Sequence, residues 1–206
     1  MLRAREPRED RSTEHDGQHP VPTWPEILAW ASAQARPIGL APELKHPTHL
    51  QERGRDPIPA FLAALEQSGF PHERLWVQCF EVTPLRQLDR STDLRLVQLI
   101  GDPRQSPADG GPSYSQMLTP EGLATIAAYA DAIGVHKQHL LPVVDGAYGA
   151  PNSVVEDAHA VGLQVHVYTF RDEPSERPSE EPSAHSELQR FYALGVDAGF
   201  ADSPDT

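Results

Sequence analysis

The sequence has a single cysteine, few basic residues and no long apolar run, and each shortage excludes a class of protein. Cys79 has no partner for an intrachain disulfide, so cysteine usage gives no indication of the compartment. The 17 Lys and Arg residues are outnumbered by 30 Asp and Glu residues, and the net charge of -13 argues against nucleic acid as a partner. No apolar run approaches the roughly 18 residues of a membrane-spanning helix, so we expect no membrane span.

The motifs of several common enzyme classes are also missing. The sequence contains no glycine-rich nucleotide-binding loop and no Gly-x-Ser-x-Gly elbow, and Cys79 lies within a strand pattern without a nearby base. The first residues lack the apolar core of a secretory signal, so we expect a cytoplasmic protein from the chain as written. The acidic balance does not exclude a phosphate ester as substrate, because one metal ion inverts the local field.

Charged, proline-containing tracts divide the chain. Residues 1–20 have almost nothing to bury and are predicted to form a disordered N-terminal tail. Residues 21–206 form the predicted folded domain, and residues 172–186 within it are predicted to be a solvated insertion loop.

Helix and strand patterns alternate through this domain. Helical patterns cover residues 23–36, 57–67, 83–88, 119–132, 152–161 and 187–194, with Thr23, Thr83 and Thr119 as predicted N-caps. Strand patterns cover residues 38–45, 75–80, 94–100, the neighbourhood of residue 133, 163–170 and 195–202. This alternation predicts parallel strands with right-handed crossovers. About six strands fit an open doubly wound sheet, or a (β/α)₈ barrel that lacks two units at its N-terminus.

The strand pattern at residues 38–45 ends in Glu43 and Lys45. Side chains two residues apart on a strand project to the same face, so this carboxylate and this ammonium group are expected side by side. They would lie at the carboxyl end of a parallel strand, where α/β proteins build their active sites. The pair suits a metal ion and a phosphate held together, and a solvated ion pair is the alternative.

Other polar side chains are expected at the same edge of the sheet, where they suit a small anionic ligand held by a metal. These residues are Gln78, Gln98, His166, Tyr168 and Asp202. Each has a structural alternative. Gln78 and Gln98 would be buried amides with internal partners, and Tyr168 would be a core residue with its hydroxyl at the edge. We expect His166 to be a buried structural histidine, and Asp202 alternatively caps a turn.

Taken in order, these segments resemble the glycerophosphodiester phosphodiesterase family, especially its periplasmic bacterial type. The matching segments are residues 21–28 (VPTWPEIL), 42–47 (PELKHP), 77–80 (VQCF), 96–100 (LVQLI), 127–134 (AAYADAIG), 165–171 (VHVYTFR) and 195–204 (GVDAGFADSP). No single segment is decisive, but the ordered set is specific.

The resemblance implies a TIM barrel that hydrolyses glycerophosphodiesters to glycerol 3-phosphate and an alcohol, with Ca²⁺ or Mg²⁺, in lipid and glycerol metabolism. It implies acid–base catalysis by two histidines. It also implies that Glu43 is a metal ligand, that Lys45 faces the phosphate, and that Gln78 and Tyr168 are on the substrate side.

The chain departs from the family pattern near its N-terminus. No His-Arg-Gly segment occurs. Glu14-His15-Asp16 has the letters of the family's metal and histidine motifs, but the apolar strand that precedes those motifs in the family is missing here. The resemblance therefore implies a barrel truncated at its N-terminus to about six βα units, without the catalytic histidines. A full-length version is expected to be periplasmic or secreted.

This departure has three expected consequences. Activity of this chain alone would be impaired, and a lone Glu43 would hold a hard cation weakly, because Ca²⁺ takes about 6–8 oxygen ligands. The open barrel edges would allow self-association. Two alternatives follow: a non-catalytic remnant or phosphoester-binding module, and a phospholipase-type barrel, whose first-strand histidine this chain lacks.

Overall fold

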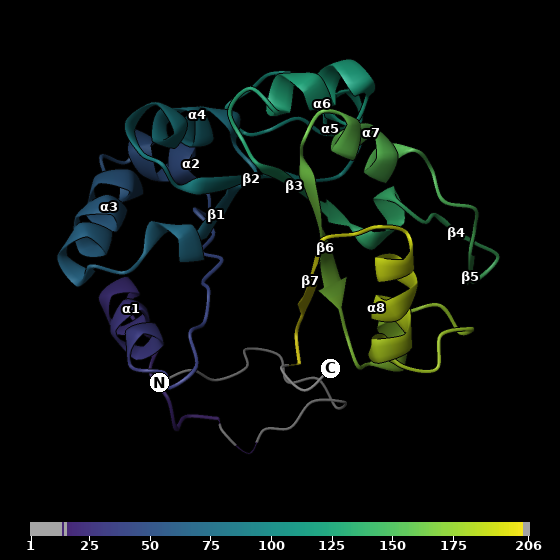
Figure 1. Cartoon of the computed structure of the whole chain (residues 1–206), viewed down its shortest axis with the longest axis horizontal. Helices are drawn as coiled ribbons and strands as arrows, with labels where there is room; N and C mark the ends of the chain where they lie inside the picture. The colour runs from purple at the N-terminus through teal and green to yellow at the C-terminus, as the bar shows by residue number, and fades with distance from the viewer. Residues whose placement is uncertain (1–13, 15, 204–206) are drawn as a thin grey trace.

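A curled parallel sheet forms the centre of the molecule. The computed structural model describes residue 14 and residues 16–203, and its main sheet has five strands in the order β1-β2-β3-β6-β7, all parallel. These strands are β1 (Trp76–Cys79), β2 (Arg95–Ile100), β3 (Ala132–His136), β6 (Gln164–Phe170) and β7 (Ala198–Ala201). The sheet curls into half of a barrel (Figure 1). The predicted α/β fold with a truncated barrel is therefore confirmed.

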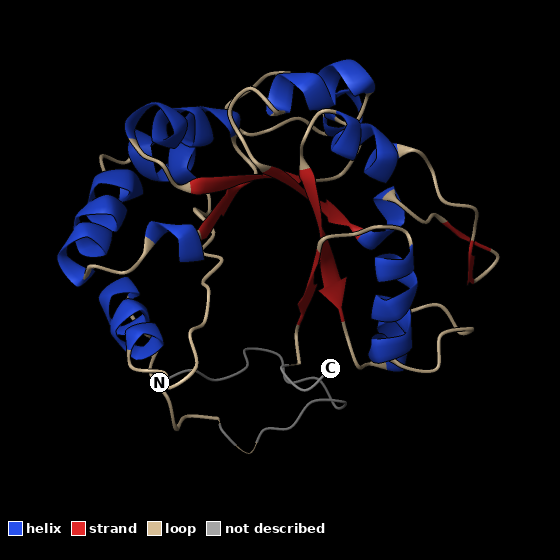
Figure 2. Ribbon diagram, viewed as in Figure 1, coloured by secondary structure: helices blue, strands red, loops and turns tan. Residues whose placement is uncertain are grey.

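Helices cover the outer, convex face of this sheet (Figure 2). They are α1 (Trp24–Ser32), α2 (Pro47–Glu52), α3 (Pro57–Ser68), α4 (Val82–Ser91), α5 (Tyr114–Met117), α6 (Pro120–Ile126), α7 (Val154–Ala160) and α8 (Ala184–Ala193). A small antiparallel hairpin of β4 (Val143–Val144) and β5 (Ala147–Tyr148) lies apart from the main sheet. No helix in the described part of the chain combines the length and the apolarity needed to cross a membrane.

Local sequence signals set most of the helix starts. The Glu26 carboxylate accepts from the Thr23 backbone N–H at 2.7 Å, which is the capping box expected before α1. The Thr119 hydroxyl accepts from the Gly122 N–H at 3.2 Å and caps α6 as predicted. The prediction of Thr83 as an N-cap was wrong. Helix α4 begins at Val82, and Asp109, from the loop after β2, accepts from the Val82 N–H at 3.2 Å.

The segment at residues 38–45 is extended but does not form a regular strand. It bridges β1 in parallel at two isolated points, Leu40 with Leu75 and Glu43 with Gln78. Pro42 accepts from the Gln78 N–H at 2.9 Å but has no N–H of its own to donate, so the ladder is interrupted. The predicted strand is therefore corrected to an extended segment that still places Glu43 beside β1.

The helix predicted to run to residue 132 ends earlier, at Ile126. Asp131 leaves the helix to join β2, because its N–H donates to the Leu96 carbonyl and its carboxylate accepts from the Leu96 N–H, at 2.9 and 2.8 Å. The weak strand expected near residue 133 is β3 (Ala132–His136).

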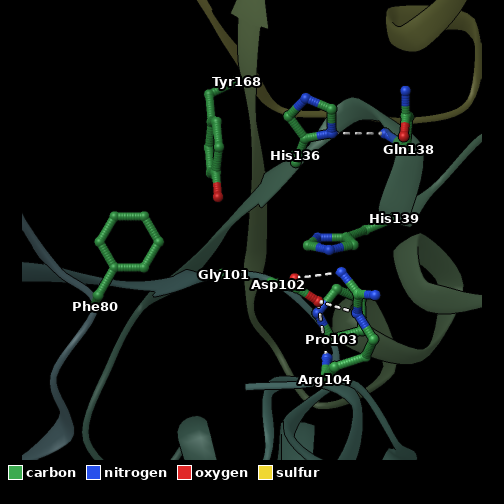
Figure 3. A pocket seen from close by; sticks show the side chains of 9 residues that line it. All are labelled: Phe80, Gly101, Asp102, Pro103, Arg104, His136, Gln138, His139 and Tyr168. Atoms are coloured by element: carbon green, nitrogen blue, oxygen red, sulfur yellow. Dashed lines mark hydrogen bonds and ion pairs between the residues drawn. The ribbon is translucent and has the colours of Figure 1, made fainter. Parts of the chain in front are cut away.

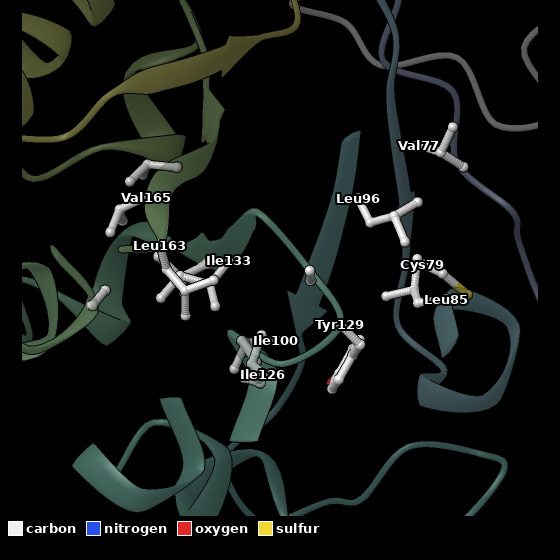
Figure 4. Packing of buried hydrophobic residues seen from close by; sticks show 14 of the residues in the cluster. Val77, Cys79, Leu85, Leu96, Ile100, Ile126, Tyr129, Ile133, Leu163 and Val165 are labelled. Atoms are coloured by element: carbon white, nitrogen blue, oxygen red, sulfur yellow. The ribbon is translucent and has the colours of Figure 1, made fainter. Parts of the chain in front are cut away.

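The main core fills the space between the sheet and its helices. Strand residues such as Val77, Leu96 and Ile133 point outward, and their side chains are fully buried against helix residues such as Leu85 and Ile126 (Figure 4). Alternate strand residues face the concave side, because successive side chains on a strand point to opposite faces. The inner cluster consists of Val97, Leu99 and Ala132, with Trp76, Phe80 and Tyr168 packed against it.

The segment predicted as a solvated loop at residues 172–186 is only partly so. Residues from Ala184 onward belong to α8, and a 3₁₀ helix (Pro174–Glu176) lies within the rest. The Glu181 side chain is buried, and its carboxylate accepts from Arg190 of α8. Arg177 donates from Nε to the Glu181 carbonyl at 3.0 Å and so connects two parts of this loop. Residues 172–183 are therefore a packed loop next to α8. Of the predicted tail at residues 1–20, residues 1–13 and 15 lie outside the described part.

Candidate functional site

The carboxyl ends of the strands converge on a cavity of about 370 Å³ at one edge of the sheet. All four residues predicted as metal or substrate contacts line it. The lining residues are Glu43, Lys45, Gln78, Phe80, Leu99, Tyr168, Thr169, Phe200, Ala201 and Asp202. Glu43, Lys45, Gln78 and Tyr168 therefore lie around one cavity, and their roles as metal and substrate contacts remain predictions.

Glu43 and Lys45 lie next to each other, as expected from their spacing. The Lys45 ammonium group is 3.9 Å from Glu43 Oε2, at the outer limit of an ion pair, and most of the Lys45 side chain is exposed. Glu43 Oε1 is different, because it is buried and has no hydrogen-bond partner. A buried carboxylate oxygen without a partner is unfavourable in an isolated protein. This oxygen therefore lacks the partner that a bound ligand would supply.

Gln78 and Tyr168 have internal partners as well as positions in the cavity. Gln78 donates from Nε2 to the Ala41 carbonyl at 3.0 Å, so its amide also braces the segment that carries Glu43. The Tyr168 hydroxyl donates to the Ile100 carbonyl at 2.6 Å, which fixes its ring at the edge of the cavity. Burial raises the pKa of Tyr168 to about 12, so the phenol keeps its proton. Both residues can contact a ligand without rearranging.

Asp202 provides a second carboxylate in the same cavity. Its Oδ2 lies 3.1 Å from Nε of Arg171, and its backbone N–H donates to the Phe170 carbonyl at 3.0 Å. Asp202 thus lies at the expected turn position after the last strand and also faces the cavity.

Two other residues of the predicted edge, Gln98 and His166, are structural, and so is Cys79 of β1. Gln98 is fully buried, donates to the Phe80 and Leu99 carbonyls, and accepts from the Tyr129 hydroxyl at 2.8 Å. His166 is buried edge-on against Trp76, which is the structural role expected for it. Cys79 is buried, and burial raises the pKa of its thiol to about 12, so it is not a nucleophile at neutral pH.

A second cavity, of about 660 Å³, adjoins the first and shares Phe80 and Tyr168 with it. Its lining residues are Phe80, Gly101, Asp102, Pro103, Arg104, His136, Gln138, His139 and Tyr168 (Figure 3). In Figure 3 the two aromatic rings stand on one side, opposite the two imidazoles and the Asp102–Arg104 pair. His136 and His139 are not among the predicted site residues, because the strand pattern near residue 133 does not define where the strand ends. His136 is the last residue of β3, at the same edge as Tyr168, its register partner on β6.

The polar side chains that line the second cavity have a net charge of about zero at pH 7. Asp102 and Arg104 form a two-point ion pair, with Arg104 Nη2 2.8 Å from Asp102 Oδ2, and this pairing lowers the pKa of Asp102 to about 2. Burial, and then the neighbouring Lys137 charge, lowers the pKa of His136 from its usual 6.5. Burial and then His136 lower the pKa of His139 in the same way. Both imidazoles are therefore uncharged at pH 7.

The described residues do not by themselves form a complete metal site. Glu43 Oε1 has the burial and the missing partner expected of a ligand atom, but Asp202 already pairs with Arg171. No group of three or more His, Cys, Asp or Glu side chains suited to a metal occurs among residues 14 and 16–203. A hard cation such as Ca²⁺ takes about 6–8 oxygens, so Glu43 fits one ligand of such a site and not the whole of it.

Comparison with known proteins gives a consistent family. The model of the glycerophosphoryl diester phosphodiesterase family matches residues 2–206. A glycerophosphodiester phosphodiesterase from Arabidopsis thaliana is 27% identical over 177 residues, which are 79% of this chain and 48% of that protein. One from Haemophilus influenzae is 25% identical over 207 residues, 87% of this chain and 54% of the relative. The chain thus spans about half the length of these curated relatives.

Solved structures show the same fold. A crystal structure assigned to a glycerophosphoryl diester phosphodiesterase from Silicibacter pomeroyi superposes with a TM-score of 0.61 at 22% identity, over 88% of this chain and 52% of that one. One from Galdieria sulphuraria has a TM-score of 0.58 at 18% identity, over 87% of this chain and 59% of that one. At these identities the match establishes the barrel-like fold alone.

Proposed function

Because this chain belongs to the glycerophosphoryl diester phosphodiesterase family, we propose that it takes part in hydrolysing glycerophosphodiesters to glycerol 3-phosphate and an alcohol. The phosphodiester would lie in the cavity lined by Glu43 and Lys45. Glycerophosphodiesters are what remains of glycerophospholipids after deacylation, so the proposed activity would belong to lipid and glycerol metabolism.

The observation that carries this proposal is the pairing of an accessible cation with an unpartnered carboxylate oxygen. The Lys45 ammonium group is mostly exposed at the cavity, and Glu43 Oε1 is buried without a hydrogen-bond partner. An ammonium group attracts a phosphate as a point charge. A carboxylate oxygen that lacks a partner is stabilised by a cation, so together they suit a phosphate and its counter-ion.

Each described side chain has a defined part in this proposal. Lys45 neutralises the negative charge of the phosphodiester, while Gln78 holds the Glu43 segment against β1. Tyr168 forms a fixed aromatic wall. In the reaction, water adds to phosphorus, the bond from phosphorus to the alcohol oxygen breaks, and the alcohol takes a proton. We assign no general acid or base among the described residues.

We further propose that Glu43 supplies one oxygen ligand to Ca²⁺ or Mg²⁺. Support comes from the buried, unpartnered Oε1 and from the oxygen ligands that these hard cations prefer. The remaining ligands would come from groups other than the side chains of the described cavity.

A phosphoester-binding module without catalytic activity is the second candidate function. It is favoured by one observation, namely that none of the described residues lining the Glu43 cavity is a histidine. Such a site has charge to bind a phosphate but no imidazole to transfer protons.

Release of glycerol 3-phosphate from glycerophosphocholine separates the two candidates. The protein is assayed with Ca²⁺, with Mg²⁺ and with a chelator, beside the Glu43→Gln variant, and binding is measured in parallel by calorimetry. Cation-dependent release that is lost in the variant supports hydrolysis. Binding without release under every condition supports the binding module, and absence of binding rejects both.

A further inference from the structure

The second cavity is continuous in its lining with the first, because Phe80 and Tyr168 belong to both. We propose that the larger cavity receives the alcohol half of the diester, and that this alcohol is an uncharged polyol such as a cyclitol or sugar. This inference rests on the proposed function, which places the phosphate beside Lys45. The larger volume, about 660 Å³ against 370 Å³, suits the variable and bulkier half of the substrate.

The charges in the larger cavity do not select an ionic group. Asp102 and Arg104 satisfy each other at 2.8 Å, and burial keeps both imidazoles uncharged at neutral pH. A cationic alcohol such as choline would meet the Arg104 guanidinium without a free carboxylate to offset it. An anionic alcohol would meet Asp102 in the same way.

The hydrogen-bonding groups complement hydroxyls. His136 Nδ1 accepts from the Gln138 backbone N–H at 3.3 Å, so the neutral ring carries its proton on Nε2, which is a donor. His139 Nδ1 is buried and has no partner, so it can serve as an acceptor when the other ring nitrogen carries the proton. A hydroxyl both donates and accepts, whereas a quaternary ammonium does neither. A buried polar group left unpaired by the wrong ligand is what makes such a site selective.

The two unpartnered buried side-chain atoms of the described chain belong to residues of these two cavities. Glu43 Oε1 belongs to a residue of the smaller cavity and His139 Nδ1 to a residue of the larger. A ligand that spans both cavities would supply a partner at each end. A diester with a phosphate at one end and a polyol at the other has this distribution of groups.

The aromatic wall suits the C–H face of a ring. The centroids of the Phe80 and Tyr168 rings are 6.4 Å apart, and the two rings are nearly perpendicular. The centroid of the His136 ring lies 5.9 Å from that of Tyr168. Because the Tyr168 hydroxyl is bound to the Ile100 carbonyl, its ring offers a fixed apolar face. Ligand pockets commonly combine such apolar walls with a few placed polar groups.

Calorimetric binding of two diesters to the intact protein tests the inference. Glycerophosphoinositol and glycerophosphocholine share the glycerophosphate half and differ in the alcohol. We expect the inositol diester to bind about 10-fold more tightly, from one or two additional hydrogen bonds. His139→Leu should lower the affinity for the inositol diester by about 3- to 10-fold and leave the choline diester unchanged. His49→Leu, on an exposed histidine, is the control.

Each result bears on the inference in a defined way. Equal affinity for the two diesters overturns the polyol preference and leaves the proposed function standing. An equal loss for both diesters in His139→Leu shows that the cavity holds the shared glycerol half, which also overturns it. Binding of neither diester rejects the proposed function and this inference with it. If His139→Leu does not fold, His139→Phe, which keeps an aromatic ring without a ring nitrogen, carries the same comparison.

Discussion

Lys137 and Glu187 form an almost fully buried ion pair that joins the end of β3 to α8. The Lys137 ammonium group lies 2.9 and 3.0 Å from the two Glu187 carboxylate oxygens, and the side chains are 5% and 0% exposed. Lys137 also donates to the Glu176 carbonyl at 3.0 Å, and the Tyr148 hydroxyl donates to Glu187. The pair therefore holds the packed loop at residues 172–183 and the β4–β5 hairpin next to His136, and His136 itself lines the larger cavity.

Removing one member of this pair should destabilise the protein strongly. Lys137→Met leaves the Glu187 carboxylate buried without its counter-ion, and we expect the free energy of unfolding to fall by about 3–5 kcal/mol. Urea denaturation followed by circular dichroism measures the change. The double variant Lys137→Met/Glu187→Leu should recover most of the loss, because it removes both charges. A loss below about 1 kcal/mol in the single variant would show that the pair contributes little.

Glu43→Gln should separate cation binding from stability. Losing one charged ligand oxygen is expected to lower the affinity for Ca²⁺ by at least about 10-fold, as measured by isothermal titration. The free energy of unfolding in cation-free buffer should change by less than about 1 kcal/mol, because the exposed pair with Lys45 contributes little. Glu52→Gln, on an exposed carboxylate of α2, is the matched control. Equal Ca²⁺ affinity in the wild type and both variants would contradict the ligand assignment.

Acidification from pH 7.5 to 5.5 should destabilise the protein through its buried histidines. Burial lowers the folded-state pKa of His136, His139 and His166 below 6.5. Between these folded pKa values and 6.5 the unfolded chain binds more protons, so stability is present above pH 6.5 and is lost as the pH falls below it. Urea midpoints measured between pH 7.5 and 5.5 should therefore decrease.

Single variants assign this pH dependence to its source. His139→Gln should flatten the decrease in midpoint, whereas His49→Gln, on an exposed histidine, should leave it unchanged. The paired Asp102 has a pKa of about 2 and contributes only at much lower pH. A midpoint that stays constant from pH 7.5 to 5.5 would contradict the lowered histidine pKa values.

Cys79 should resist thiol reagents in the folded protein. Its thiol is buried, its pKa is raised to about 12, and its Sγ donates to the Leu44 carbonyl at 3.1 Å. Labelling by an aromatic disulfide reagent at pH 8 should therefore be at least about 100-fold slower in buffer than in denaturant, because thiolate and access are both needed. Equal rates in the two conditions would show that the segment at residues 38–45 opens readily.

The sequence determined the fold class and most of the first cavity. Alternating helix and strand patterns suffice for parallel strands, and the carboxyl ends of parallel strands meet at one edge whatever their exact order. Glu43, Lys45, Gln78 and Tyr168 could thus be assigned to one site from their positions near the carboxyl end of each strand pattern. Residues 38–45 do not form the predicted strand, but Glu43 still lies at this site because two backbone bridges to β1 position it as a strand would.

Only the tertiary structure decided the second cavity, the partners of the buried groups and the fit of a metal. His136 and Lys137 are adjacent in sequence, yet one lines a cavity and the other enters a buried ion pair with a residue 50 positions away. Asp109 caps α4 from 27 residues beyond Val82. Local sequence carries the period of a helix or strand, but burial and charge pairing depend on which distant groups the fold brings together. For that reason His139, which we propose selects the ligand, had no local signal in the sequence.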